Sequence, residues 1–148
     1  MPRMLRVDGS KARVLVIHPS AHMRRLIITL MAALGVKACE EARSTVQAIP
    51  LVLKNLPNLI VIDLGGDSTE ALLFAHRLRR GEFGHADTSV LGISPSSHHA
   101  MLELAWEAGI SDMVPTPISA IEIIQRAGAL IEESHRRKPL GGTRSAAE

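Results

Sequence analysis

The sequence predicts one α/β domain in which five parallel strands are covered by helices on both faces. Short apolar runs alternate five times with longer stretches of helical periodicity. The runs 14–17 (VLVI) and 58–63 (NLIVID) are apolar almost throughout, which is typical of parallel strands buried on both faces. With 148 residues, 46% of them hydrophobic, the chain is long enough for one domain with its own core.

The elements follow one another along the chain with short connections. The predicted strands are 14–17, 36–40, 58–63, 89–94 and 112–114. The predicted helices are 21–34, 44–55, 68–81, one that Ser96 or Ser97 caps and that ends near 108, and 118–135.

Caps and breakers support several of these limits. Ser20 is placed to cap the first helix and Gly35 to stop it. Pro50 lies inside the second helix, where proline removes a backbone donor, so this helix is expected to be kinked or to begin late. On the first helix we expect Leu26, Ile27, Leu30 and Leu34 to face the core.

The chain divides into three parts. We assign 1–11 to an N-terminal extension, 12–135 to the domain and 136–148 to a disordered basic tail.

Composition excludes several classes of protein. A net charge of +2 is too slight to indicate a nucleic-acid partner, and single Cys39 excludes a disulfide framework. No apolar stretch approaches the length of a membrane span or a signal peptide, so a cytoplasmic protein without membrane contact is expected.

In sheets of this kind, sites form at the carboxyl ends of the strands. The chemistry-bearing residues at the predicted ends are His18 with Pro19, Asp63, Ser94, and Thr116 with Pro117. No nucleophile–base–orienter set is visible among them, so an enzyme is not expected.

At these strand ends the sequence resembles the receiver domain of bacterial two-component response regulators, over about 13–133. The stretches that carry the resemblance are VLVIHPSAHMRRLI, LPNLIVIDL, VLGIS and AGISDMVPTPIS, in the family's order. The likeness is greatest to stand-alone receivers that carry no output domain. It implies a flavodoxin-like (βα)5 fold with strand order 2-1-3-4-5.

The resemblance implies roles for three residues. Asp63 matches the phosphoacceptor, Ser94 matches the switch hydroxyl that binds the acyl phosphate, and Pro117 matches a proline that usually follows a cis bond.

Four positions depart from the family's pattern. His18 and Pro19 replace the paired acids that bind magnesium, Thr116 replaces a lysine, and Met113 replaces the aromatic switch residue. Because Mg²⁺ prefers oxygen ligands in octahedral array, magnesium binding is expected to be weak or absent, with no other metal or cofactor. Losing both cations removes most of the charge neutralisation that a phosphorylated aspartate needs.

The sequence therefore predicts a degenerate receiver (pseudo-receiver) that acts by protein–protein contact. Its expected partners are a histidine kinase, a phosphotransfer protein, another receiver or a second copy of itself. Two alternatives stay open: a working phosphoacceptor at Asp63, and a metal- or ligand-binding module that uses a His18/Asp63 pocket.

Two interpretations of His18 also stay open. The ring either forms an ion pair with Asp63 that locks the site or senses pH, or makes a satisfied polar contact in the emptied metal position. A zinc site from His18, His22 and Asp63 is a further hypothesis.

Helical spacing places apolar side chains on outer faces where receivers usually carry charge, and exposed aliphatic patches mark partner sites. These interface candidates are Met101, Leu104 and Trp106 on the fourth helix, Ile28 and Ala32 on the first, and Ile121 and Ile124 on the last.

Overall fold

The computed structural model describes residues 8–95 and 98–147, with side chains described as far as Arg137. The strands are β1 (Arg13–Ile17), β2 (Ala38–Ala42), β3 (Leu59–Asp63), β4 (Ser89–Ser94) and β5 (Asp112–Pro115). The helices are α1 (Ala21–Ala33), α2 (Thr45–Asn55), α3 (Thr69–Arg79), α4 (His99–Ala108) and α5 (Ala120–Ala147).

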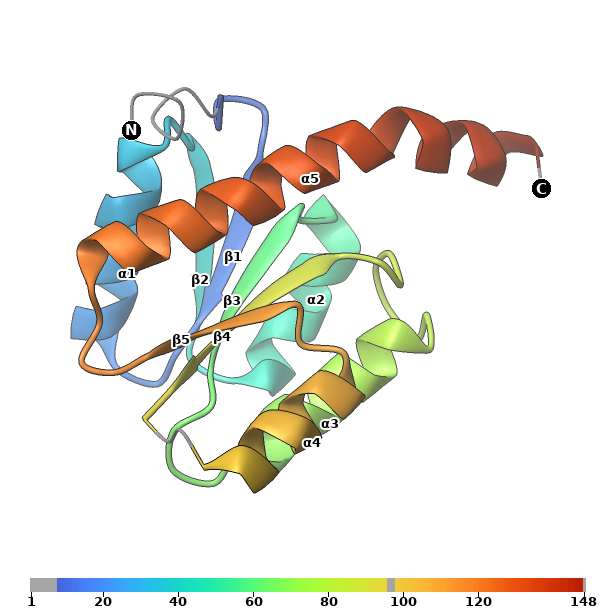
Figure 1. Ribbon diagram of the computed structural model, residues 1–148. Helices are drawn as coiled ribbons and strands as arrows, with labels where there is room; N and C mark the ends of the chain where they lie inside the picture. The colour runs from blue at the N-terminus through green and yellow to red at the C-terminus, as the bar shows by residue number, and fades with distance from the viewer. Residues whose placement is uncertain (1–7, 96–97, 148) are drawn as a thin grey trace.

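Within the described residues, the strands form one parallel sheet in the order β2-β1-β3-β4-β5 (Figure 1). The predicted fold class and strand order are therefore confirmed. In the same part of the chain, every helix is too short or too polar to cross a membrane.

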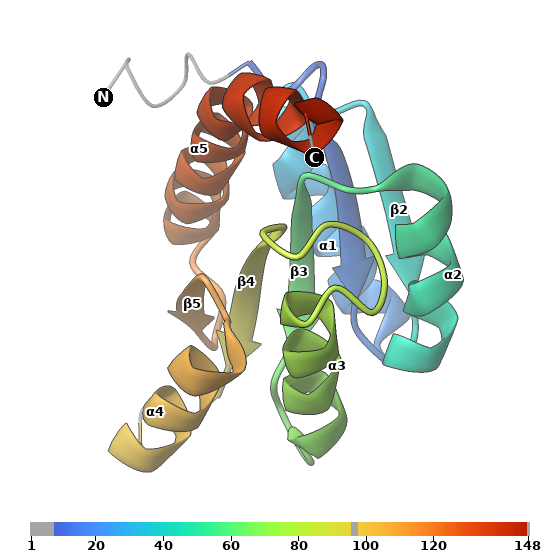
Figure 2. The ribbon, with the colours of Figure 1, turned by 90° about the vertical axis from the view of Figure 1, so that its right-hand side faces the viewer.

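Helices cover both faces of the sheet, and each face has its own core (Figure 2). Side chains of α1 and α5 pack on one face, and those of α2, α3 and α4 pack on the other. Successive strand residues point to opposite faces, so Leu15 and Ile17 join the α2–α4 core while Val14 and Val16 join the α1–α5 core. This is why the central strands are apolar throughout.

The second strand begins later than the sequence predicted. We expected it over 36–40, but β2 spans Ala38–Ala42 and Ala38 pairs with Arg13. Val36 belongs instead to the turn after α1, where its N–H donates to the Met31 carbonyl at 3.2 Å and its side chain is buried. An apolar residue that fills the core from a turn has been mistaken for the start of a strand.

The second helix begins where the sequence predicted, although it contains a proline. Ser44 caps it by accepting a hydrogen bond from the Gln47 N–H at 3.2 Å, and Pro50 lies inside the helix with its ring exposed. The expectation of a late start was therefore wrong. On the exposed face the carbonyl that loses its helical partner can be hydrated, which lowers the cost of the proline.

The fourth and fifth helices also differ from their predicted limits. α4 begins at His99 with His98 as N-cap, and the expected caps Ser96 and Ser97 lie outside the described residues. α5 continues to Ala147, past His135 where its end was predicted. Ion pairs at i,i+4 spacing extend it there, from Glu132 and Glu133 to the next two arginines. The sequence-based domain limits, including the disordered tail, stay predictions.

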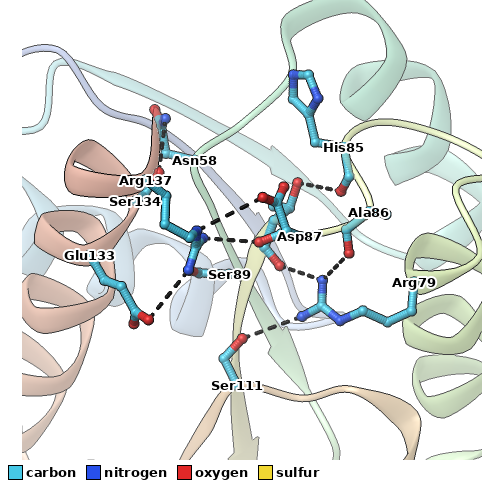
Figure 3. Close-up of polar contacts among 11 residues, drawn as sticks. Asn58, Arg79, His85, Ala86, Asp87, Ser89, Ser111, Glu133, Ser134 and Arg137 are labelled. Carbon is cyan, nitrogen blue, oxygen red and sulfur yellow. Dashed lines mark hydrogen bonds and ion pairs between the residues drawn. The ribbon is translucent and has the colours of Figure 1, made fainter. Parts of the chain in front are cut away.

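A network of hydrogen bonds lies at the end of the sheet where β4 and β5 begin (Figure 3). The Arg79 guanidinium donates to the carbonyls of Gly109 (2.6 Å), Thr88 (2.7 Å) and Ala86 (2.8 Å). Arg137 on α5 donates to the Asp87 carbonyl at 3.0 Å. These bonds tie α3, α5 and the loop before β4 together at the end of the sheet opposite to the carboxyl ends of the strands.

Neighbouring residues on α3 provide a test of the core. Phe74 is 2% exposed in the α2–α4 core, whereas Leu73 is 51% exposed. Phe74→Ala should lower the free energy of unfolding by about 3–5 kcal/mol because it leaves a cavity. Leu73→Ala should change it by no more than about 0.5 kcal/mol. Urea denaturation measures both; equal losses would contradict this packing.

Candidate functional site

The predicted site residues lie together at the carboxyl-terminal end of the sheet, because each one ends or follows a strand. His18 follows β1, Asp63 ends β3, Ser94 ends β4 and Thr116 follows β5. Strand order reverses between β1 and β3, so His18 and Asp63 flank the position where α/β sheets place their sites.

His18 and Asp63 face each other across this reversal. The His18 Nε2 lies 3.6 Å from the Asp63 Oδ1, and the two side chains are 12% and 19% exposed. The distance exceeds that of a hydrogen bond, so the contact is electrostatic and partly shielded from water.

The protonation state of His18 follows from its other nitrogen. Nδ1 accepts a hydrogen bond from the Ser20 N–H at 3.0 Å, so the neutral ring carries its proton on Nε2, toward Asp63. Burial lowers the pKa of His18, the Asp63 carboxylate opposes this shift, and Arg24 adds to it. The ring is therefore neutral near pH 7, which favours the satisfied polar contact over the ion pair.

The loop after β3 wraps closely around the Asp63 carboxylate. The Gly65 N–H donates to Asp63 Oδ1 at 3.1 Å, and a Cβ added at Gly65 would lie 3.2 Å from the same oxygen. Gly66 has φ +60°, a conformation that glycine adopts without strain. The pair therefore forms a tight turn that supplies one backbone donor to the carboxylate.

Arg24 is a site residue that the sequence analysis missed. It is 9% exposed, its Nε donates to Glu41 Oε1 at 2.6 Å, and its Nη1 donates to the carbonyls of His18 (2.8 Å) and Pro19 (3.3 Å). It thus fixes the backbone of the loop that carries His18. The available signal was its spacing, three residues before Ile27 and seven before Met31, which places it on the buried face of α1.

The remaining predicted site residues lie around the same edge. Ser94 is 2% exposed, and its carbonyl accepts a hydrogen bond from the Thr116 N–H at 3.2 Å. The Thr116–Pro117 bond is cis. Met113 packs against the α2–α4 core and is only partly exposed. The switch and phosphoacceptor roles of these residues stay predictions.

The donor set at this edge does not fit magnesium. Asp63 offers the only carboxylate among the predicted site residues, the neutral His18 offers nitrogen, and the Pro19 side chain offers nothing. Arg24 already occupies the carbonyls of His18 and Pro19. Mg²⁺ completes its octahedron with waters, but a single carboxylate provides too little charge and too few protein oxygens to hold it tightly.

The zinc hypothesis also fails. Across the described residues, no three His, Cys, Asp or Glu side chains are grouped as a metal site would require. His22 lies on the exposed side of α1, so His18, His22 and Asp63 do not form such a group.

The outer faces differ in part from the predicted ones. Leu104, Trp106 and Ile121 are 51%, 47% and 66% exposed, Ala32 is exposed, and Met101 is half-buried.

Three residues lie on another face than the sequence predicted. Ile28 and Ile124 were predicted to face outward but pack against the α1–α5 core, and Leu26, predicted to be core, is exposed. The buried stripe of α1 and its C-cap is Arg24, Ile27, Met31 and Leu34, and it includes a basic residue that an apolar count leaves out. The contact roles of the exposed residues stay predictions.

The lowered pKa of His18 gives a pH dependence of stability. Between the unfolded pKa of about 6.5 and the lower folded pKa, the unfolded state binds more protons, so the free energy of unfolding falls as pH falls below about 6.5. His18→Asn keeps an acceptor for the Ser20 N–H but cannot titrate, so it should flatten this slope. Urea denaturation between pH 7.5 and the acid range (roughly pH 5) measures it; identical slopes in both proteins would contradict a shifted His18.

Sequence comparisons find two curated relatives, although no family model matches the chain. The chain is 25% identical over 121 residues to the phosphate regulon transcriptional regulatory protein PhoB of Pseudomonas aeruginosa. It is 29% identical over 121 residues to a protein-glutamate methylesterase/protein-glutamine glutaminase of Pyrococcus abyssi. These matches cover 82% and 81% of this chain but only 52% and 32% of those proteins.

Solved structures match the fold over most of the chain. The signal receiver domain of a LuxO repressor protein from Vibrio parahaemolyticus has a TM-score of 0.76 at 15% identity, with 87% of this chain and 96% of that one covered. The chemotaxis protein CheY4 of Vibrio cholerae has a TM-score of 0.72 at 15% identity, with 80% and 98% covered. NtrX from Brucella abortus, in complex with ADP, has a TM-score of 0.75 at 20% identity, with 90% and 29% covered.

These matches agree with the strand order β2-β1-β3-β4-β5. The chain has the fold of response-regulator receiver domains.

Proposed function

We propose that this chain is an atypical receiver of bacterial two-component signalling that acts in the cytoplasm by protein–protein contact, with magnesium-dependent phosphorylation of Asp63 weak or lost. The observation that carries the proposal is the His18 ring 3.6 Å from Asp63, with its Nδ1 accepting from the Ser20 N–H, where the family resemblance expects a metal-binding acid. The solved structures with the same fold include receiver domains, and this supports the signalling context.

The charge balance around Asp63 is the physical basis. Phosphorylation would replace the single negative charge of the Asp63 carboxylate by the roughly 1.5–2 negative charges of an acyl phosphate, on a side chain that is already mostly shielded from water. The nearby cation, Arg24, is engaged by Glu41 and two carbonyls. Thr116 offers a hydroxyl in place of an ammonium group. Charge-assisted hydrogen bonds contribute about 1.5–3 kcal/mol each, so losing the metal and the lysine removes most of the driving force.

The proposed contact surface lies on α4 and the start of α5. Leu104, Trp106 and Ile121 are large apolar side chains that are about half exposed or more, and half-buried Met101 lies one turn before Leu104 on α4. A histidine kinase, a phosphotransfer protein or another receiver would cover them. We propose no catalytic activity for the chain itself: the methylesterase relative is matched over only 32% of its length, and its activity belongs to that protein.

A working phosphoacceptor is the second candidate. It is favoured by the position of Asp63 at the end of β3, with its carboxylate 19% exposed and the buried Ser94 ending the adjacent strand. The same experiment separates the two candidates.

The test adds beryllofluoride with Mg²⁺, a mimic of the phosphorylated aspartate, and follows Trp106 fluorescence together with fluorine NMR. The wild type should show no saturable change, because it lacks the oxygen donors and the second cation. The triple variant His18→Asp, Pro19→Asp, Thr116→Lys restores them and should bind the mimic.

The control adds Asp63→Ala to the triple variant, which should abolish its response. A saturable response of the wild type that Asp63→Ala removes would overturn the proposal and establish the phosphoacceptor. If the triple variant folds but does not respond, the electrostatic explanation is wrong.

A further inference from the structure

Helix α4 has little apolar surface to hold it against the rest of the domain. It lies beside α3, which is its main neighbour (Figures 1 and 2). The buried side chains of α4 are those of Ala105 and Ala108, whereas α3 buries larger ones, among them Phe74 and Leu78. The larger apolar side chains of α4 are half-buried or exposed. Because the free energy gained on burial grows with apolar area, packing holds α4 less firmly than it holds α3.

One guanidinium group on α3 binds the carboxyl end of α4. Arg79 donates to the carbonyl of Gly109, the C-cap of α4, from Nε at 3.0 Å and from Nη2 at 2.6 Å. Its Nη2 also donates to Ser111 Oγ at 3.3 Å, and its Nη1 donates to the carbonyls of Ala86 and Thr88 (Figure 3). These contacts use all five N–H donors that a guanidinium group has.

The contacts of Arg79 provide what the apolar face of α4 lacks. The last carbonyls of a helix have no partner within it, and they lie at the negative end of the helix dipole, where a cation is favoured. The planar guanidinium binds this helix end and the loop before β4 at once, which an ammonium group with three donors could not do in the same geometry. Detaching α4 must therefore break its hydrogen bonds to Arg79.

We propose that α4 opens from the domain as a unit, ahead of global unfolding, and that Arg79 is the residue that holds it closed. The sheet and the other helices keep their structure in the open form, because the fully buried side chains that α4 withdraws from the core are two alanines. Such an opening requires less free energy than global unfolding, since it exposes less buried surface.

The opening itself requires no partner. Only its consequence rests on the proposed function: Leu104 and Trp106, which are about half exposed, would meet a partner on a helix that can change its orientation.

Native-state hydrogen exchange of the full chain, followed by NMR at low urea concentrations, measures the opening. The main-chain amides of α4 should exchange with a lower free energy of opening than those of β3, which exchange only on global unfolding. The urea dependence of the α4 opening should be less than about half that of β3, because this slope scales with the surface exposed.

Two neighbouring arginines provide a matched pair of variants. Arg79→Met should raise the equilibrium constant for opening of α4 at least about tenfold, the effect of losing one hydrogen bond from a charged donor. Arg79→Lys keeps the charge but not the five-donor fork, so it should restore only part of the protection. Arg80→Met should change the constant less than about twofold, because Arg80 is 62% exposed and pairs with Glu82 instead.

A variant in the opposite core separates local opening from global unfolding. Ile27 is fully buried in the α1–α5 core, so Ile27→Val should speed the exchange of β3 and leave the opening of α4 unchanged. Arg79→Met should speed both, because its hydrogen bonds are lost in both. Circular dichroism checks that each variant is folded, and Arg79→Lys provides the test if Arg79→Met does not fold.

Three results would overturn the proposal. One is exchange of α4 with the same free energy and urea slope as β3. Another is an opening that Arg79→Met leaves unchanged, or that Arg80→Met raises equally. The third is an Ile27→Val variant that acts equally on α4 and β3. Every measurement is made without Mg²⁺ or beryllofluoride, so this inference and the proposed function can fail separately.

Discussion

The contact between a neutral imidazole and the Asp63 carboxylate is the constraint on which the site depends. Parallel strands β1 and β3 bring the two groups to one point, and the Ser20 N–H fixes which nitrogen of His18 carries the proton. Arg24 then fixes the backbone of this loop by donating to the carbonyls of His18 and Pro19. The site is thus satisfied by its own hydrogen bonds, in a region where the receiver pattern would use a divalent cation.

The fold was predictable from sequence because the central strands are buried on both faces, which leaves an unbroken apolar run at 14–17 and again at 59–62. The elements whose limits were wrong had mixed signals. Val36 is apolar but fills the core from a turn, and the end of α5 depends on i,i+4 ion pairs beyond His135. Pro50 broke a propensity rule without breaking the helix, because its ring is exposed.

The site was only partly predictable, for a different reason. Spacing alone located His18, Asp63, Ser94 and Thr116 at the strand ends. It could not show that Nδ1 of His18 is already bound, nor that Arg24 is buried, because both depend on how α1 packs. The error at Leu26 has a related origin: the buried face of α1 begins at a basic residue, Arg24, which a count of apolar residues does not include.

The hydrogen bonds of Arg79 and Arg137, at the opposite end of the sheet, indicate which substitutions the chain tolerates. Arg79 and Arg137 bind main-chain carbonyls of 86–88, and every amino acid provides a carbonyl. The exposed side chains at 86 and 87 can therefore vary more than buried Thr88 while the junction of α3, α5 and β4 persists. Gly109 cannot, because it has φ +97° and a Cβ there would lie 2.5 Å from Cγ of Arg79. Among homologues, the arginine and the glycine should therefore persist, while the exposed residues 86 and 87 vary.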